Sequence, residues 1–168
     1  MTATPRAATR SRRGRALVAI GAVAALASGC QMATNELNPG REALKAADKA
    51  PLGKVVVSEE GRTLYMFVKD EPHESYCYGA CASVWPPVTT KGAPEVEGLD
   101  QTKVTLIKRD DGLMQVVYNG HPLYYYQGDA AADDHYGQEK DQFGAEWYAV
   151  STDGAKAEMQ KGGQGYGS

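Results

Sequence analysis

Two cysteines, Cys77 and Cys81, stand four residues apart in the string Cys-Tyr-Gly-Ala-Cys. On one turn of helix, residues four apart lie on the same face, and their separation of roughly 6 Å is within the range that a disulfide accepts. Two thiolates are also soft ligands that select Cu(I). The pair therefore predicts either a structural disulfide or a copper or redox site, in which His73, His121 or Met66 would supply a third ligand.

The third cysteine, Cys30, ends a leader with the three parts of an export signal. Five arginines precede an uncharged run from Ala16 to Ala27, and the small residues Ser28 and Gly29 come directly before the cysteine. The apolar run is too short to cross a bilayer, which takes about 20 apolar residues. The pattern resembles a bacterial lipoprotein signal, in which the cysteine is lipidated on its sulfur and becomes the first residue. An ordinary secretory signal with a chance cysteine is the alternative.

This leader predicts the compartment. We expect residues 1–29 to be removed after export by the general secretory or the twin-arginine route. Cys30 would then anchor the chain at the outer face of the cytoplasmic membrane through at least two acyl chains, because one chain alone binds weakly. In an oxidising compartment a disulfide is the expected state of Cys77 and Cys81, so the disulfide is favoured over the copper site.

Removal of the leader makes the chain acidic. The full sequence has 18 Lys and Arg against 21 Asp and Glu, and residues 1–29 contain five arginines and no acidic residue. The mature chain would therefore carry a net charge of −8. This balance argues against nucleic acid as a partner and against a purely electrostatic hold on anionic lipid.

The sequence is rich in tyrosine. It has ten tyrosines and two tryptophans but only two phenylalanines, and all but one of the tyrosines lie in the domain. They could form the core of a β domain, which we favour, or line a ligand cleft where two halves meet. The motif aromatics are Tyr65, Phe67, Tyr124 and Tyr126, and the cleft would be lined by Tyr65, Tyr124, Trp85 and Trp147. For Asp70 and Asp129, starting a turn is favoured over accepting hydrogen bonds from backbone or tyrosyl groups.

Other candidate chemistry is weaker. The three histidines, His73, His121 and His135, have no ligand spacing. An acidic loop could hold Ca²⁺, but its order does not match an EF-hand and a solvated loop is favoured; its members are Asp129, Asp133, Asp134, Glu139 and Asp141. The sequence lacks nucleophile-elbow, phosphate-loop and zinc-protease motifs, so we expect a protein that is not an enzyme.

The elements that must position these residues are mostly strands. β-branched and aromatic runs separated by Asp-Gly and Asn-Gly turns predict antiparallel hairpins, with strands over residues 54–58, 63–68, 104–108, 113–118, 122–127 and 146–151. One short helical turn is expected over residues 78–84. We expect a lipidated, flexible tether over residues 30–50, transiently helical from 42 to 49. One compact β domain over residues 51–152 and a disordered tail over residues 153–168 complete the expected order.

An internal repeat organises the domain. Residues 61–70 align with residues 120–129, sharing Gly, Leu-Tyr, a second aromatic and Asp, and each copy is followed by an insert and a tryptophan. The Tyr-x-aromatic-x-x-Asp unit, present twice, with Cys-Tyr-Gly-x-Cys-Ala-x-x-Trp-Pro-Pro between the copies, is similar to a family of secreted-repeat bacterial lipoproteins. The resemblance covers about residues 53–150, and the family has no agreed biochemical function.

The sequence therefore predicts a lipid-anchored, mostly antiparallel β domain built from two related repeats, with no cofactor. The expected role is non-catalytic binding of an envelope partner or a small ligand. The alternative is a copper-binding or electron-transfer lipoprotein centred on Cys77 and Cys81, with His121 as a further ligand. The two readings differ in the thiol state of the cysteines, which is a disulfide in the first and a reversible dithiol in the second.

Overall fold

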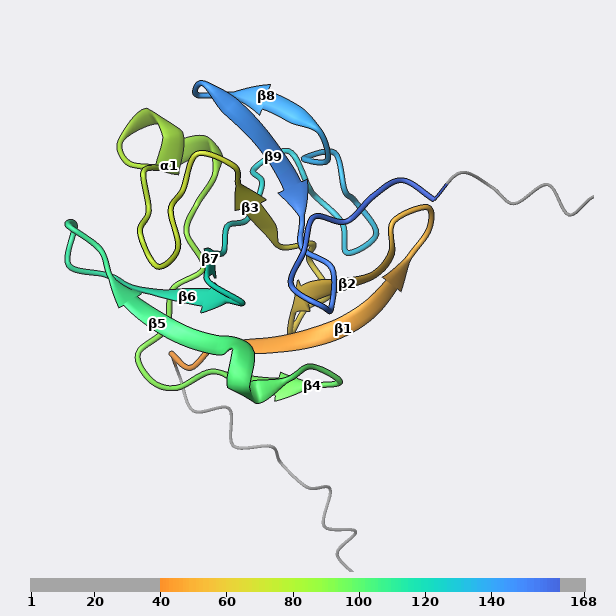
Figure 1. Cartoon of the computed structure of the whole chain (residues 1–168), viewed down its shortest axis with the longest axis horizontal. Coiled ribbons are helices and arrows are strands. Elements are labelled where there is room, and N and C mark those ends of the chain that lie inside the picture. Colours follow the sequence, from red (N-terminus) through yellow and green to blue (C-terminus); the bar gives the residue numbers. More distant parts are fainter. Residues whose placement is uncertain (1–39, 161–168) are drawn as a thin grey trace, which may run out of the picture. The chain divides into compact units, whose positions relative to one another are not determined.

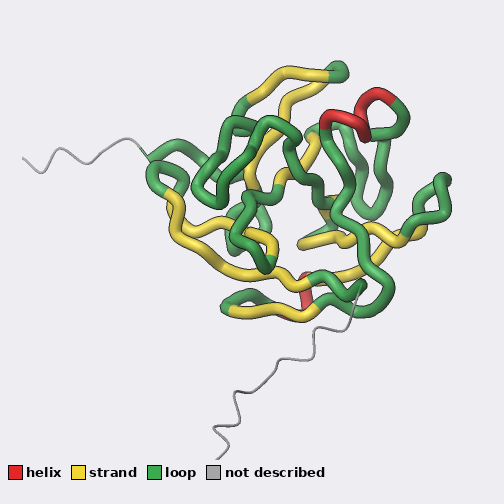
Figure 2. The backbone as a smooth tube through the Cα atoms, turned by 180° about the vertical axis from the view of Figure 1, so that it is seen from behind, coloured by secondary structure: helices red, strands yellow, loops and turns green. Residues whose placement is uncertain are grey.

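The computed structural model describes residues 40–160, which form a mostly β fold (Figure 1). Helix in this range is confined to α1 (Ala80–Val84) and one 3-10 turn (Gln101–Lys103), as the colouring of Figure 2 shows. None of the helices described is long and apolar enough to cross a membrane. The strands are β1 (Ala43–Lys49), β2 (Gly53–Ser58), β3 (Tyr65–Phe67), β4 (Glu95–Glu97), β5 (Val104–Lys108), β6 (Met114–Tyr118), β7 (His121–Pro122), β8 (Lys140–Gln142) and β9 (Ala145–Ala149).

The strands form three small sheets, with the orders β2-β1-β4, β3-β9-β8 and β5-β6-β7. All pairs are antiparallel except β1 with β4, which run parallel. The hairpin β5–β6 turns at Gly112 and β6–β7 turns at Asn119-Gly120, where both residues have positive φ as this type of tight turn requires. The predicted mostly antiparallel β domain is therefore confirmed, including the three-strand meander.

The two repeats occupy equivalent places and exchange strand segments. In the first, Val56 donates to the Val150 carbonyl (2.8 Å), Val150 to Leu64 (3.0 Å) and Leu64 to Val56 (3.1 Å). The second contains the matching cycle, in which Val116 donates to Val88 (2.8 Å), Val88 to Leu123 (2.9 Å) and Leu123 to Val116 (2.9 Å). Each cycle takes one residue from the other repeat, so neither repeat completes its own hydrogen bonds.

The centre of this exchange is a bridge between the two motif tyrosines. Tyr65 donates its amide to the Tyr124 carbonyl at 2.9 Å, and Tyr124 returns a bond of the same length to Tyr65. Since the two residues are equivalent in the repeat, this reciprocal pair marks an approximate two-fold axis. The predicted match of Tyr65 with Tyr124 is thus realised as direct antiparallel pairing.

The structure corrects both ends of the predicted domain. Residues 43–49 were expected in a flexible or transiently helical tether, but they form β1, because backbone pairing with both β2 and β4 overrides their alanine-rich helix propensity. Residues beyond 152 were expected in the tail, yet Ala157 is buried and donates to the Ala149 carbonyl. Gln160 donates in turn to the Pro51 carbonyl. The predicted leader, the lipidated Cys30 and the last eight residues lie outside the described range.

Two predicted strands are shorter than expected. Of residues 63–68 only Tyr65–Phe67 form β3, and residues 122–127 are affected more strongly. Only His121 and Pro122 belong to β7, whereas Tyr124 makes single bridges to Tyr65 and Pro87. The motif strand of the second repeat therefore leaves β6 after two residues, because its partners from Tyr124 onward come from the first repeat. Its position opposite Tyr65 brings the aromatic side chains of both repeats into one core.

Candidate functional site

The motif residues converge on a stack of four aromatic rings. Trp85 and Trp147 lie face to face with centroids 4.0 Å apart and an interplanar angle of 5°. Phe67 stacks on the outer face of Trp147 at 4.1 Å, and Tyr126 covers Trp85 at 4.4 Å. Each tryptophan is therefore covered by the second aromatic of a motif, so that the stack follows the two-fold relation of the repeats.

The motif tyrosines pack edge-on against the same stack. Tyr65 contacts Trp85 at 5.4 Å between centroids and Tyr124 contacts Trp147 at 5.1 Å, both with nearly perpendicular rings. This edge-to-face geometry is favoured between aromatic rings and adds about 0.5–1.5 kcal/mol per pair to the area buried. The six rings form one continuous cluster that contains residues of both repeats.

The two motif carboxylates cross between the repeats. The Tyr65 hydroxyl of the first repeat donates to Asp129 Oδ2 of the second at 2.6 Å, and the Tyr124 hydroxyl of the second donates to Asp70 Oδ2 of the first at 2.6 Å. Hydrogen bonds to ionised acceptors are this short and about twice as strong as neutral ones. The motif Tyr and Asp of one copy are thus not partners of each other.

Each carboxylate also holds the loop that follows it. Asp70 Oδ1 accepts from the Tyr76 amide at 2.8 Å, and Asp129 Oδ1 accepts from the Tyr136 amide at 2.9 Å. The preference for a simple turn-initiating aspartate is therefore wrong, because both side chains accept tyrosyl and backbone hydrogen bonds. The less favoured prediction, that Asp70 and Asp129 accept hydrogen bonds from backbone or tyrosyl groups, is the correct one.

Burial alters the protonation of these pairs. Desolvation raises the pKa of Asp70 to about 6, opposed by the Tyr124 and Tyr76 hydrogen bonds and by the positive charge of Arg109. Desolvation also raises the pKa of Asp129, against the bonds from Tyr65 and Tyr136. The pKa values of the hydroxyls of Tyr65 and Tyr124 are raised by burial and by the neighbouring carboxylates, so both phenols stay protonated donors.

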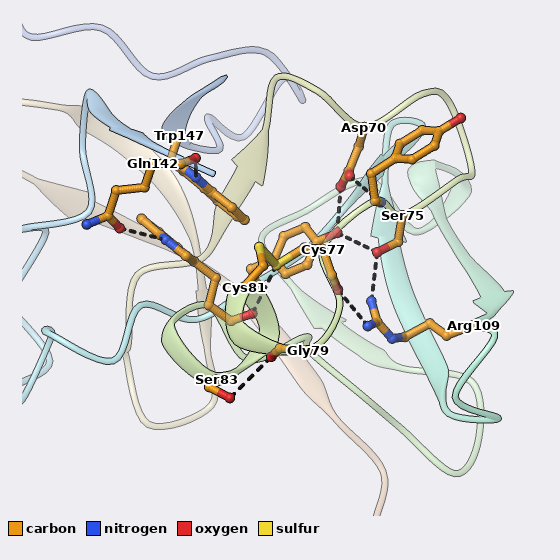
Figure 3. The surroundings of a disulfide bond; sticks show 12 residues. Asp70, Ser75, Cys77, Gly79, Cys81, Ser83, Arg109, Gln142 and Trp147 are labelled. Carbon is orange, nitrogen blue, oxygen red and sulfur yellow. Dashed lines mark hydrogen bonds between the residues drawn. A yellow bond between two sulfur atoms is a disulfide. The ribbon is translucent and has the colours of Figure 1, made fainter. Parts of the chain in front are cut away.

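Arg109 connects the Asp70–Tyr124 pair to the loop of residues 77–81 that contains both cysteines. Its guanidinium donates to Ser75 Oγ, to Gln115 Oε1 and to the Cys77 carbonyl, each at 2.7 Å, as part of Figure 3 shows. Ser75 Oγ lies 2.7 Å from the Tyr124 hydroxyl, so the network continues to Asp70. The guanidinium also stacks over the Tyr78 ring at 4.2 Å and bonds Asp111 at 3.0 Å. These contacts satisfy a buried charge that would otherwise be costly.

Cys77, which precedes α1, forms a disulfide with Cys81 in its first turn, with Cα atoms 5.2 Å apart. Both cysteines are buried beside the stacked tryptophans (Figure 3). Trp85 follows α1 and donates its amide to the Cys81 carbonyl at 2.8 Å. The disulfide prediction is confirmed in the structure, and the bond fixes the turn from which Trp85 enters the core.

The repeats differ where the disulfide lies. The residue after the Asp70-bound amide is Cys77, whereas the residue after the Asp129-bound amide is Gly137. A Cβ at Gly137 would lie 2.7 Å from the Tyr65 ring and 2.9 Å from that of Trp85. The second repeat therefore replaces a covalent crosslink with close backbone packing.

The predicted copper set with a histidine as third ligand does not assemble. Within residues 40–160 no three His, Cys, Asp or Glu side chains are grouped so that they could hold a metal ion, and this includes His73, His121 and the two cysteines. The pKa of His121 is lowered by burial and by Lys156. The acidic loop is equally ungrouped: Asp134 instead accepts from the amides of Ala130 and Ala131 at 2.8 Å.

The ligand-cleft interpretation of the aromatics is corrected. Tyr65, Tyr124, Trp85 and Trp147 each have 0% of their surface exposed. Rings packed against one another with no exposed surface line no open cleft in this structure. The core interpretation, which the sequence favoured, describes all four.

Several residues of this network were not found from the sequence. Gln142 accepts from Trp85 Nε1 through its side chain at 2.9 Å and from Trp147 Nε1 through its carbonyl at 3.0 Å. Arg109 and Ser75 were also missed. All three are polar residues outside the motif, and no pattern in the sequence marks them.

The comparisons agree with the repeat. A family model described as a secreted repeat of unknown function matches residues 46–89 and again residues 105–151. These two segments carry the exchanged strands, the motif residues and the stacked tryptophans. No curated protein and no solved structure gives a match. Two copies of one unit, each completing the other, and a family model that covers more than half of the sequence show that this chain belongs to that family of secreted repeats.

Proposed function

We propose that this protein is a non-catalytic binding module, anchored by a lipid on Cys30 at the outer face of the cytoplasmic membrane, that binds an envelope partner or a small ligand. The leader and the family's secreted lipoprotein character support the location. The observation that carries the proposed role is that the motif tyrosines and aspartates are buried and hydrogen-bonded to one another.

The polar groups of the motif residues are hydrogen-bonded within the protein. The hydroxyls of Tyr65 and Tyr124 each donate to a carboxylate, and both carboxylates also accept a backbone amide. Among the described side chains, no buried nitrogen or oxygen lacks a hydrogen-bond partner. A general acid or base needs reach to a substrate proton, and these buried pairs present none. The motif therefore serves to build a rigid module, and recognition falls to its surface.

Two repeat-related tyrosines are the strongest surface candidates for contact with a partner. Tyr76 and Tyr136 follow the motif aspartates, and the two residues are 42% and 64% exposed although their amides donate to Asp70 and Asp129. Exposed aromatic rings on a fixed backbone are favourable contacts, because they bury large areas at a low entropy cost.

In-cell photocrosslinking tests the binding role. A photoreactive phenylalanine analogue at Tyr76 or Tyr136 should give a discrete adduct in the envelope, whereas the same analogue at exposed Asp48 in β1 should give none. Equal, diffuse labelling from all three positions would count against a partner at this surface. Stoichiometric copper on freshly isolated protein with free thiols would instead favour the metal-binding alternative.

A further inference from the structure

We propose that the β5–β6 turn and the adjoining start of β1 form a membrane-docking face that rests on the lipid surface to which Cys30 is anchored. The inference depends on the proposed lipid anchor and specifies how the anchored domain is oriented. It commits to an anionic lipid surface as the occupant. We call this surface the docking face and define it as Arg41, Lys91, Lys108, Leu113 and Met114.

The docking face presents apolar side chains to solvent. Leu113 is 48% exposed and Met114 is 36% exposed, directly after the turn at Gly112. The fold does not require them, because the repeat-related position at the start of β2 has Gly53 and Lys54 instead. Exposed neighbouring apolar residues rimmed by polar ones are typical of protein or membrane contact sites.

Three cationic side chains lie on the hairpin and on the segments that adjoin it. Lys108 is the register partner of Met114 in the β5–β6 hairpin and is exposed. Lys91 is exposed next to Thr90, whose amide donates to the Met114 carbonyl at 3.0 Å. Arg41 is exposed near Gly92 and pairs with Glu95 at 3.0 Å. Acidic Asp110 and Asp111 lie at the same turn, and Asp111 is bonded to buried Arg109.

The described part of the chain begins beside the docking face. Lys91 donates its amide to the Gly40 carbonyl at 2.7 Å, and Thr90 Oγ1 accepts from the Glu42 amide at 3.1 Å. Thr90 thus contacts both the first described residues and Met114. Figure 1 shows the start of β1 on the same side of the domain as the β5–β6 turn.

The tether is short enough to make weak contacts effective. Gly40 is ten residues after Cys30, and a chain of this length spans at most about 35 Å. A short linker raises the effective concentration of the tethered surface to the millimolar range. Cations near an anionic membrane surface add to the binding, and apolar side chains enter the interface. The mature chain is acidic as a whole, so a local cluster, rather than net charge, must provide the attraction.

Quenching by lipid tests the orientation. Full-length lipidated Leu113→Trp and Lys54→Trp variants would be reconstituted into phosphatidylcholine vesicles with and without phosphatidylglycerol, with brominated lipid as quencher. Lys54 is exposed at the start of β2, the segment of the first repeat that corresponds to the start of β6, and both existing tryptophans are buried. We expect strong quenching of the Leu113→Trp variant on anionic vesicles and little quenching of the Lys54→Trp variant. Lys108→Glu in the Leu113→Trp background should lower the equilibrium constant for docking, read from the quenching, by at least about fivefold.

The outcomes separate the two proposals. Vesicle-bound protein with equal quenching at both positions, or with none at either, would overturn the docking face and leave the anchor intact. Protein that fails to remain on vesicles would overturn the lipid anchor and, with it, the docking face. Quenching that is unaffected by phosphatidylglycerol and by Lys108→Glu would contradict the role of the cations.

Discussion

At the scale of single residues, the molecule depends on side chains that complete the other repeat. Tyr65 and Tyr124 are both fully buried, and each donates to the aspartate of the opposite motif copy. Removing one partner of a buried hydrogen bond leaves the other unsatisfied, which costs about 1–3 kcal/mol and more when the remaining group is charged. Substitutions of the motif residues should therefore lower the free energy of unfolding rather than act directly on binding at the surface.

Gly137 should tolerate no side chain. Gly137→Ala places a methyl group within 2.9 Å of the Tyr65 and Trp85 rings, so we expect a loss of roughly 1–3 kcal/mol in the free energy of unfolding. Urea denaturation measures this loss. Gly92→Ala is the matched control, since its nearest atom is 3.7 Å away, and it should stay within about 0.5 kcal/mol. Equal effects would show that the close packing at Gly137 is unimportant.

Asp70 should make stability depend on pH. Burial raises its folded-state pKa from 3.8 to about 6, so between these values the folded protein binds more protons than the unfolded chain. Its contribution is therefore fully present below pH 3.8 and is lost as the pH rises through about 6. The unfolding free energy of the wild type minus that of Asp70→Asn should fall between pH 4 and pH 7. A difference that rises over this interval would contradict a carboxyl group whose pKa is raised by burial.

At the scale of elements, the sequence predicted the hairpins better than the segments that complete them. The dipeptides Asp111-Gly112 and Asn119-Gly120 marked turns that the structure contains. In contrast, β1 reads as helix, because Ala-Leu-Lys-Ala-Ala-Asp-Lys has no period-two alternation and its strand form depends on two partners distant in sequence. Local sequence patterns predict turns, whereas they do not predict strand pairing between residues distant in the sequence.

The same limit applied to the site. The motif spacing correctly predicted that Tyr65 and Tyr124 are equivalent and that the aromatics form a core. It could not predict the crossing of the carboxylates, because the choice between Asp70 and Asp129 as the partner of Tyr65 depends on the exchanged strands. For the same reason Gln142 and Arg109 gave no signal: their roles exist only once both tryptophans and the cysteine loop have come together.

The disulfide should stabilise its element modestly. It closes a loop between residues four apart in sequence, for which chain entropy gives about 2 kcal/mol, less than the ~3 kcal/mol of a 15-residue loop. We expect Cys77→Ser/Cys81→Ser to lower the free energy of unfolding by about that amount and to leave the fold intact. Mass spectrometry of unreduced wild-type protein should find the two cysteines joined. Free thiols in protein taken directly from cells would contradict a structural disulfide.

At the scale of the whole molecule, the two repeats form a single cooperative unit. Hydrogen-bond cycles, the aromatic stack and the crossed Tyr–Asp pairs each draw residues from both copies. A repeat expressed alone would lack the strand that completes its cycle and the carboxylate that binds its tyrosine. Separate halves should therefore remain unfolded by circular dichroism when alone and gain strand structure when mixed. A half that folds by itself would contradict this interdependence.

The most direct test of the exchanged architecture is a pair of double-mutant cycles on unfolding free energy. One cycle joins Tyr65→Phe with Asp129→Ala across the repeats, and the other joins Tyr65→Phe with Asp70→Ala within the first repeat. Partners in one hydrogen bond show coupling of about 0.5–3 kcal/mol, whereas residues that share no interaction add independently. We expect coupling only in the cycle between repeats. Coupling within the first repeat, with additivity between the repeats, would contradict the crossed pairs and the architecture built on them.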